Sequence, residues 1–461
     1  MKSRLALAIA GCVALAGCMV GPKYKRPSLP IPSTYRGETT TAAAGTASFG
    51  ALKWSEVFHD PVLENLIRTA LIQNYDLKIA AARILQAEGQ LRVTHANQLP
   101  QVNGTGGVTE QRIYFAPSFP GFKFTQYHLG GAASWLLDFW GQYRRATEAA
   151  RAALLASRDN QQAVRVTLVS EVASAYFQLR ALDLELQISE DTLKSRQVSF
   201  HLTQIKEQGG VSSMLDVRQA QSLVETAETT ITDTNRLITQ QEDAISILLG
   251  ENPRAIPRGL PLNAETLAPQ LPPGLPSSLL ERRPDIRIAE EQLVAANAQI
   301  GVARAQLFPQ VALTGSAGGE SFQLAQLFSN GIWSIAGNLT QPIFEGGALR
   351  GNLQAVRAEE QEAVLTYKKA VQEAFREVSD ALVAYQRDRK FLAEQQELTK
   401  TLADADHIAR LQYQGGVTTY LDVLTQETQY FNAQLGAAQA KYNELASVVE
   451  LYQALGGGWQ Q

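Results

Sequence analysis

Two ten-residue stretches decide how this chain folds: QGGVSSMLDV at residues 208–217 and QGGVTTYLDV at residues 414–423. Each begins with a Gly-Gly pair, which ends a helix because glycine readily adopts positive φ and loses much backbone entropy when ordered. The Ser or Thr that follows can cap a new helix, and the Asp three residues later completes a capping box. We therefore predict that both stretches are tips of helical hairpins.

Long segments of helical composition flank both tips. No proline occurs from Gly141 to about Gln208, and a second long helix is expected from about Ala348 to Gln414. Apolar residues recur there in the 4-3 spacing of a coiled coil. The pattern includes Leu168, Val172, Ala175, Leu179, Leu182, Leu186, Leu193 and Phe200 before the first tip, and Val217, Ala220, Val224, Ala227 and Ile231 after it; Leu421, Leu424, Thr428 and Phe431 follow the second tip. Such narrow seams predict helices that pair side by side. A water-filled ring and a solid bundle both fit this periodicity.

Matched segments show that the chain is a tandem duplication. DLKIA at residues 76–80 corresponds to DIRIA at 285–289, and LPQV at 99–102 corresponds to FPQV at 308–311. The matches appear in the same order around the two tips, which indicates two copies of one structural unit. The predicted copies are residues 53–252 and 277–461, joined by a proline-rich linker at 253–276. In the first copy, one helix is expected from about Pro61 to Gln98.

A change from helical to alternating periodicity predicts one β-hairpin in each copy, at about residues 101–139 and 310–344. The expected strands are long enough to cross a bilayer at a tilt. Open sheet edges are not viable in lipid, so membrane-spanning strands must close into a barrel. One chain has too few strands for closure, whereas a ring of chains would have enough. A small soluble sheet packed on the helices is the alternative.

The N-terminus has the features of a processing signal. Lys2 and Arg4 precede an apolar run at residues 5–15, which is too short to span a bilayer. The following LAGC sequence resembles a bacterial lipobox. This resemblance implies a lipoprotein signal peptide at residues 1–17 and a diacylated Cys18 at the mature N-terminus; an ordinary signal peptide is the alternative. Residues 18–52 are expected to form an extended tether that separates the body from its lipid anchor.

The composition disfavours nucleic-acid binding and shows no catalytic or metal-binding pattern. The 461 residues include 41 Lys and Arg against 45 Asp and Glu, a net charge of −4. The 5 histidines are scattered without metal-ligand spacing, and neither a phosphate-binding loop nor a nucleophile motif occurs. We therefore predict no enzyme activity, cofactor or metal site.

Several stretches form one recognisable set: LAGC with Pro22, Tyr24, Arg26 and Pro27; ERRPDI at 281–286; AANA at 295–298; Ile300-Gly301; Ala303-Arg304-Ala305; PIF at 342–344; both GGV tips; and LYQALGGGW at 451–459. In these residues, in order and over essentially its whole length, the chain resembles the outer-membrane efflux factors of the TolC/OprM type. The resemblance implies a mainly α, tandem-duplicated TolC-like fold with a small β part of four transmembrane strands. It further implies a homotrimer with a twelve-stranded barrel in the outer membrane and a twelve-helix tunnel in the periplasm.

The same resemblance implies a passive exit duct for drugs or other small toxic compounds. Its partners would be a periplasmic membrane-fusion adaptor, an inner-membrane RND-type pump and outer-membrane lipid. A duct of the same type for protein secretion or metal export is the alternative, although only three methionines are present. A lipid-anchored periplasmic coiled-coil scaffold is more distant.

The tips would form the periplasmic aperture and contact the adaptor. The residues concerned are Gly209, Gly210, Val211 and Ser212 at the first tip and Gly415, Gly416, Val417, Thr418, Thr419 and Tyr420 at the second. Asp422 is expected to line the pore, a role compatible with helix capping. Thr418 replaces the charged residue that many relatives carry, and Tyr420 is a candidate for the bulk that narrows the opening.

Overall fold

The computed structural model describes residues 19–36, 48–114, 121–265, 274, 276–329 and 331–457. Two compact units are present. Unit 1 combines the N-terminal residues up to Leu29 with Ala82–Arg158 and Arg287–Lys369, and unit 2 combines Pro30–Ala81, Asp159–Ile286 and Ala370–Gln461. Each unit therefore takes corresponding pieces from both copies of the duplicated sequence.

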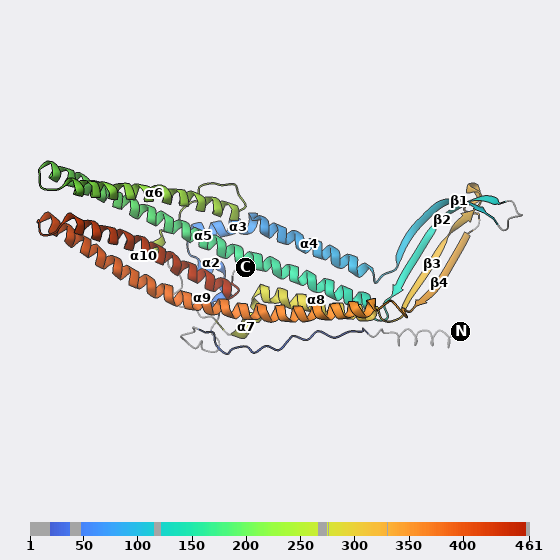
Figure 1. The fold of residues 1–461 in the computed structure, drawn as a ribbon. Helices are drawn as coiled ribbons and strands as arrows, with labels where there is room; N and C mark the ends of the chain where they lie inside the picture. The colour runs from blue at the N-terminus through green and yellow to red at the C-terminus, as the bar shows by residue number, and fades with distance from the viewer. Residues whose placement is uncertain are drawn as a thin grey trace. The chain divides into compact units, whose positions relative to one another are not determined.

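Helices dominate the chain, and the two copies contain long helices of equal length (Figure 1). Helices α5 and α9 have 67 residues each, about 100 Å at 1.5 Å per residue. Helices α6 and α10 have 35 residues each. The helices are α2 (Trp54–Val57), α3 (Pro61–Gln73), α4 (Tyr75–Ala96), α5 (Gln142–Gln208), α6 (Met214–Leu248), α7 (Pro276–Arg282), α8 (Pro284–Ala305), α9 (Ala348–Gln414) and α10 (Tyr420–Ala454), with 3-10 turns η1 (Phe49–Ala51), η2 (Leu262–Ala264) and η3 (Leu324–Gln326).

The predicted seam is confirmed along α6 but only partly elsewhere. Val217, Ala220 and Ala227 are buried, whereas Leu421 at the start of α10 is exposed. Between residues 166 and 182, α5 is buried on several sides rather than along one stripe. A thick aromatic core forms there in unit 2, and it includes Phe49, Phe58, Tyr176, Phe177 and Tyr452. Side-by-side pairing is thus an incomplete description of the bundle.

The helix expected from Pro61 to Gln98 is interrupted at Asn74, where α3 ends and α4 begins. The Asn74 side chain accepts hydrogen bonds from the Asp76 and Leu77 amides at 2.8 and 3.1 Å. Its amide group also donates to the Leu248 carbonyl at 3.0 Å. Asn74 therefore caps α4 and anchors it to the end of α6, a role that helical composition alone did not reveal.

The N-terminal segment is extended but is not a free tether. In unit 1, Tyr24 donates a hydrogen bond to Glu290 at 3.0 Å, and Arg26 forms a two-nitrogen ion pair with the same carboxylate. A Cβ on Gly21 would lie only 2.6 Å from the Gly301 Cα, so the backbones meet closely here. These contacts hold residues of the tether against the body, contrary to the expected separation.

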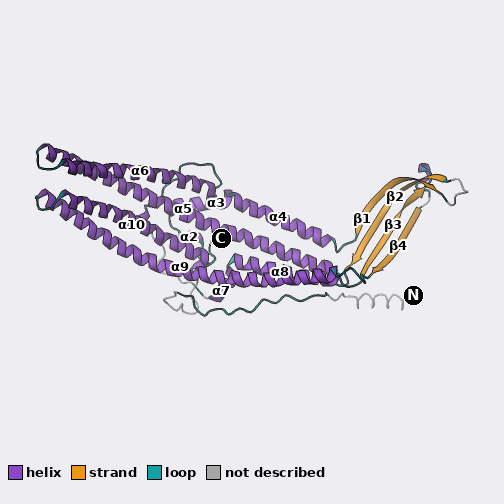
Figure 2. Ribbon diagram, in the orientation of Figure 1, coloured by secondary structure: helices purple, strands orange, loops and turns teal. Residues whose placement is uncertain are grey.

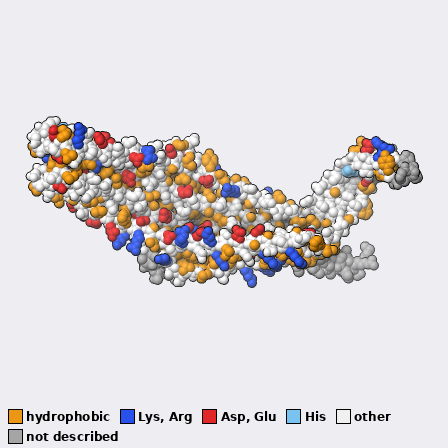
Figure 3. Space-filling model, in the orientation of Figure 1, with side chains coloured by type: hydrophobic (Ala, Val, Ile, Leu, Met, Phe, Trp, Pro, Cys, Tyr) orange, Lys and Arg blue, Asp and Glu red, His pale blue; other side chains and the backbone are white. Residues whose placement is uncertain are grey.

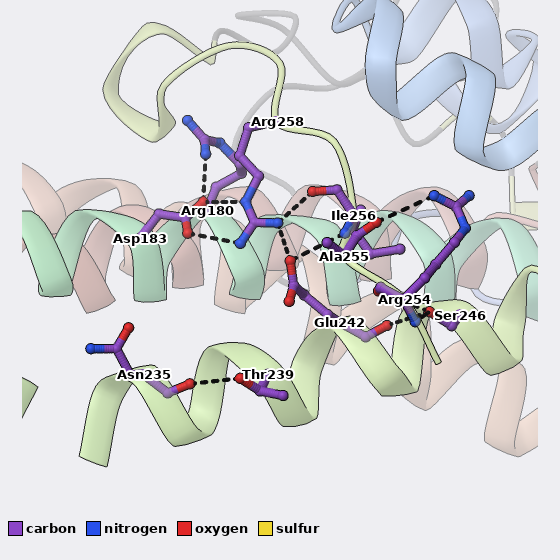
Figure 4. Close-up of polar contacts among 10 residues, drawn as sticks. All are labelled: Arg180, Asp183, Asn235, Thr239, Glu242, Ser246, Arg254, Ala255, Ile256 and Arg258. Atoms are coloured by element: carbon purple, nitrogen blue, oxygen red, sulfur yellow. Dashed lines mark hydrogen bonds and ion pairs between the residues drawn. The ribbon is translucent and has the colours of Figure 1, made fainter. Parts of the chain in front are cut away.

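The described part of the proline-rich linker is also held against helices α5 and α6 (Figure 4). Arg258 joins Asp183 of α5, at 3.1 Å, to Glu242 of α6. The Ile256 amide donates to the same Glu242 carboxylate at 3.1 Å, and the Ile256 side chain is buried. Prolines give this segment an extended path, while its charged and apolar side chains hold it against α5 and α6 within unit 2.

The four strands form one antiparallel sheet in unit 1, in the order β1-β2-β3-β4 (Figure 2). They are β1 (Gln101–Ile113), β2 (Phe122–Leu137), β3 (Gln310–Ser321) and β4 (Gly331–Thr340). The central pair β2–β3 joins the two copies of the sequence, with Trp135 opposite Leu313. Among the described residues, β1 and β4 each have only one neighbouring strand, so both outer edges of the sheet are open. The mainly helical fold with four strands is confirmed.

Candidate functional site

The first tip is closed by a hydrogen-bonded turn that requires glycine. Gly210 has a φ of 73°, in the left-handed region. The Val211 amide donates to the Lys206 carbonyl at 2.8 Å, and the Gly210 amide donates to the Glu207 carbonyl, also at 2.8 Å. This pair of bonds is the Schellman motif, which satisfies the last carbonyl groups of a helix. The sequence GGV therefore ends α5 and reverses the chain.

The second tip repeats this geometry. Gly416 has a φ of 72°, the Val417 amide donates to the Gln412 carbonyl at 2.9 Å, and the Gly416 amide donates to the Tyr413 carbonyl at 3.2 Å. A Cβ on Gly416 would meet nothing within 4 Å. Glycine is thus needed here for its backbone conformation, while the space beside it is open.

Both tips continue into a capping box. At the first tip, the Asp216 carboxylate accepts from the Ser213 amide at 2.9 Å and from the Ser212 hydroxyl at 2.8 Å, while the Ser213 hydroxyl accepts from the Asp216 amide. Burial alone would raise the pKa of Asp216, but these hydrogen bonds lower it overall. Asp216 is therefore an ionised cap at the N-terminus of α6.

Asp422 occupies the corresponding position at the second tip and is fully exposed. Its carboxylate accepts from the Thr418 hydroxyl at 2.5 Å, the Thr419 hydroxyl at 2.7 Å and the Thr419 amide at 3.1 Å. The hydrogen bond from Thr418, followed by those from Thr419, lowers the pKa of Asp422. Thr418 thus holds an ionised Asp422 in place and does not supply a charge of its own.

Tyr420 lies inside the chain, with only 5% of its surface exposed. It packs in a small cluster with Ala220, Ala409, Val423 and Leu424. Burial, more than the neighbouring charges, raises the pKa of its hydroxyl to about 12, and that hydroxyl is hydrogen-bonded to Thr203. In this conformation the ring fills the space between the hairpins.

A cation-π contact joins the two hairpins close to the tips. The Lys206 ammonium of α5 lies 3.9 Å from the centre of the Tyr413 ring of α9. That ring is in turn 5.3 Å from the ring of Tyr420. Such a contact is worth about 0.5–1 kcal/mol at an exposed site.

Behind the tips, a buried ionic cluster connects the same hairpins. Glu427 of α10 is paired with Arg196 of α5 at 3.2 Å and with Arg410 of α9 at 3.1 Å. Arg410 also contacts Asp406 at 2.8 Å. The Arg196 and Glu427 side chains are only 2% and 5% exposed. Burial raises the pKa of Glu427, and the two guanidinium groups oppose that rise.

Apolar side chains are exposed at the ends of both hairpins. Val211 and Val417, at equivalent positions of the two turns, have 80% and 77% of their surface exposed. Met214, Leu215 and Leu421 are exposed on the first turns of α6 and α10. Single exposed apolar residues are common, but a group of them at the same kind of turn is typical of an interaction surface.

The two faces of the sheet differ in chemistry. In an antiparallel sheet, residues in register project to the same face and neighbours along a strand alternate. The register therefore collects Val102, Val108, Leu129, Ala133, Trp135, Leu137, Val311, Leu313, Ala317, Trp333, Ile335 and Leu339 on one side, with glycines between them. We call this the apolar face. Its charged residues, Glu110, Arg112 and Lys123, lie toward the β1–β2 turn, where Figure 3 also shows charged side chains.

The opposite side is mostly polar, and we call it the polar face. It carries Gln101, Asn103, Thr105, Thr109, Gln111, Gln126, His128, Ser134, Gln310, Thr314, Ser316, Glu320, Ser334, Asn338 and Thr340. The Ser316 and Ser334 hydroxyls hydrogen-bond across the strands at 2.8 Å. An apolar face backed by a polar one, on strands that cross a bilayer, is the pattern of outer-membrane channel proteins.

Comparison with known proteins agrees with this pattern. The model of the family described as outer membrane efflux protein matches residues 66–251 and 275–457. This chain belongs to the outer membrane efflux protein family. Among its relatives, the probable efflux pump outer membrane protein TtgC of Pseudomonas putida is 35% identical over 100% of this chain and 96% of its own length. The cation efflux system protein CusC of Escherichia coli is 35% identical over 98% of each chain.

Solved structures of the family have the same fold. The open state of the outer-membrane channel MtrE of Neisseria gonorrhoeae superposes with a TM-score of 0.87 at 31% identity, covering 96% of this chain and 99% of that one. A membrane protein of Pseudomonas aeruginosa gives a TM-score of 0.89 at 33% identity over 96% and 98%. The resemblance to TolC- and OprM-type factors is thereby confirmed. The chain is an outer-membrane efflux channel of a family of channel proteins.

Among the described residues, no helix has the combined length and hydropathy needed to cross a bilayer. Cys18, the expected lipidation site, lies outside the described residues.

Aromatic side chains on and near the sheet lie in several different environments. Trp135 and Trp333 lie on the apolar face, whereas Phe122 and Phe124 stack at 5.4 Å on the other face. Trp140 stacks on Phe308 at 4.7 Å, just outside the ends of β2 and β3.

Sequence reasoning missed the ionic cluster behind the tips. Arg196 falls between Leu193 and Phe200, at a place in the 4-3 repeat where an apolar residue is expected. Its partner Glu427 is 231 residues away. A charged residue at a seam position was the available signal, but only the structure shows which residue it meets.

Proposed function

We propose that three copies of this chain form the exit duct of a tripartite efflux pump. The observation that carries the proposal is the sheet, with one apolar face, one polar face and two open edges. Unpaired backbone groups cost several kcal/mol each in lipid, so the edges at β1 and β4 need partners. Three chains joined edge to edge would pair them in a closed twelve-stranded barrel, with polar faces around a water-filled lumen and apolar faces toward lipid.

The helical-hairpin tips would then surround the periplasmic aperture and meet a membrane-fusion adaptor, which links the duct to an inner-membrane RND-type pump. Exposed Val211 and Val417 supply apolar contact area, and the two Schellman turns present them on a fixed backbone. Asp422 is the pore-lining candidate because it is ionised and exposed at the second tip. Energy for transport comes from the pump, and the duct conducts passively.

Drugs or other small toxic compounds are the proposed cargo. Relatives with nearly equal identity are named for antibiotic efflux, toluene efflux and cation efflux, so the duct itself does not choose between them. Export of metal cations is the second candidate, favoured by the similarity to the cation efflux protein CusC. Deleting the gene and measuring susceptibility to a panel of organic drugs and to copper and silver salts separates the two.

The detergent-corrected native mass of the protein extracted from outer membranes tests the assembly. A trimer supports the closed barrel and makes conductance and adaptor cross-linking at the tips the next measurements. A monomer leaves the edges of β1 and β4 unpaired and removes the channel, which would favour a lipid-anchored periplasmic scaffold.

Neutralising Asp422 is expected to weaken the selection of cations at the aperture. A ring of three ionised carboxylates concentrates cations at a narrow opening, so Asp422→Asn should lower the K⁺ to Cl⁻ permeability ratio by about threefold at low salt. Reversal potentials of single trimers in a KCl gradient measure this ratio. Asp216→Asn is the matched control, since it removes the same kind of helix cap at the first tip. Equal effects of the two changes would assign Asp422 to capping alone.

A bulky residue at Gly416 is expected to uncouple efflux while the trimer still forms. Left-handed backbone costs a side-chain-bearing residue roughly 1–2 kcal/mol, enough to move the turn but too little to unfold long helices. Gly416→Leu should therefore make cells as drug-sensitive as a strain lacking the protein, with normal trimer levels. Gly351→Leu is the control, because Gly351 is helical and a Cβ there also meets nothing within 4 Å. Wild-type resistance in the Gly416→Leu strain would rule out a role of this turn in coupling.

A further inference from the structure

The polar face of the sheet carries very few charges. Across the described residues of β1 to β4, its ionisable side chains are His128 on β2 and Glu320 on β3. The rest of the face consists of amides, hydroxyls and small or apolar groups. A single carboxylate can therefore set the sign of the electrostatic potential along this surface.

Glu320 occupies a defined place at the end of the sheet. It lies one residue beyond Gly319, which pairs with Gly331 at the last rung between β3 and β4. Across the other ladder it faces His128. Glu320 is half-buried, and the described residues provide it with no ion-pair partner.

His128 does not neutralise this carboxylate by contact. A Cβ built on Gly107 of β1 would lie 2.5 Å from the His128 ring, so the imidazole leans over β1 and away from β3. Gly107 leaves room for that ring because it has no side chain. The geometry leaves the Glu320 carboxylate as the one fixed negative charge on the polar face.

The other face of the sheet provides an internal comparison. Glu110 lies near the same end of the sheet but on the opposite side, and it pairs with Lys123 at 3.3 Å. Arg112 lies on the same side as this pair. The Glu110 carboxylate therefore has an ion-pair partner, whereas that of Glu320 has none within the part of the chain that the structure describes.

We propose that Glu320 is a selectivity residue of the duct: three Glu320 carboxylates form a ring at the end of the lumen where β3 leads into β4, and they favour cations over anions. This inference rests on the proposed trimeric duct, in which the polar faces surround the lumen. Fixed charge on the wall of a water-filled pore raises the local concentration of counter-ions, and the effect grows as ionic strength falls. The contribution of this ring to selectivity would add to that of the Asp422 carboxylates at the aperture.

Bilayer recordings in an Asp422→Asn background test the proposal, because the aperture then contributes least to selectivity. In a KCl gradient at low salt, adding Glu320→Gln is expected to lower the K⁺ to Cl⁻ permeability ratio by about twofold, and Glu320→Lys to lower it further. Glu320→Asp keeps the charge and should restore the ratio. Glu110→Gln, which removes the same charge from the opposite face, should leave the ratio unchanged.

Two different failures can be told apart. If purified wild-type protein inserts but never conducts, the proposed duct is wrong and the selectivity role falls with it. If conducting trimers form and Glu320→Gln behaves like Glu110→Gln, only the role of Glu320 is overturned.

Discussion

Replacing Glu427 with alanine is expected to lower the free energy of unfolding of the helical bundle by about 3–5 kcal/mol. The loss arises because Arg196 is 2% exposed and would remain buried without its carboxylate partner. Arg410 would lose the same partner and keep only Asp406 and the Ser199 hydroxyl. Removing one member of a buried pair costs more than the pair contributes to stability. The remaining charge is still desolvated, and it no longer has a partner to compensate for that cost.

Chemical denaturation in detergent, followed by helical circular dichroism, measures this effect. Glu394→Ala is the matched control: Glu394 lies on α9 in an exposed pair with Lys390 at 3.4 Å, and such pairs contribute about 0–1 kcal/mol. Hydrogen exchange of the amides around Arg196 and Glu427 adds a local readout, because the opening should begin between the hairpins. A Glu427→Ala effect no larger than that of Glu394→Ala would mean that the cluster is not stabilising.

A further variant separates charge from packing. Replacing Glu427 and Asp406 with leucine and both Arg196 and Arg410 with methionine removes all four charges of the cluster and keeps apolar volume. A buried ion pair is often no more stabilising than apolar residues of similar size, so this quadruple variant should be more stable than Glu427→Ala alone. If it is less stable, the cluster contributes net stability through its hydrogen bonds, which include that from Arg196 to the Leu223 carbonyl at 3.0 Å.

The sequence was a good guide wherever a local rule determined the structure. Gly-Gly followed by a Ser or Thr and then Asp specifies a Schellman turn and a capping box within ten residues, and both tips form them. Alternation along 331–340 specified a strand with two unlike faces. In these cases every contact that fixes the structure lies within a few residues along the chain.

The sequence was a poor guide where distant residues decide the structure. Tyr420 follows the tip directly, yet contacts from Ala220 and Ala409 bury it, and neither is a sequence neighbour. Tyr24 and Arg26 look like parts of a flexible tether until Glu290 is placed beside them. Composition indicates how a segment behaves when it is solvated. It does not indicate which distant residues will bury that segment in the fold.

The strongest pH dependence of stability is expected from a buried carboxyl pair that fixes the linker to unit 2. Asp60 is fully buried, caps α3 through the Val62 amide at 2.7 Å, and accepts from the Tyr176 hydroxyl at 2.6 Å and the Leu260 amide at 2.9 Å. Glu265, also buried, hydrogen-bonds to the same carboxylate. Burial first, and then Asp60, raises the pKa of Glu265 to about 8, whereas Arg180 and Lys441 oppose that rise. At neutral pH the pair therefore shares one proton, held mainly by Glu265.

Stability should consequently fall as pH rises from about 4.5 to about 8, because the folded state binds the Glu265 proton more tightly than the unfolded state does. The stabilisation from this proton is complete below pH 4.5 and lost above about pH 8, and it amounts to roughly 5 kcal/mol in all. The pKa of Asp60 is lowered, so the stability that Asp60 contributes is lost only as pH falls below about 3.8. Asp60 therefore does not change stability between pH 4.5 and 8. Unfolding midpoints measured at unit intervals from pH 5 to 9 report the slope. Glu265→Gln removes the proton but keeps a donor for Asp60, so its slope should be nearly flat across the window. An unchanged slope in Glu265→Gln would place the titrating group elsewhere in the protein.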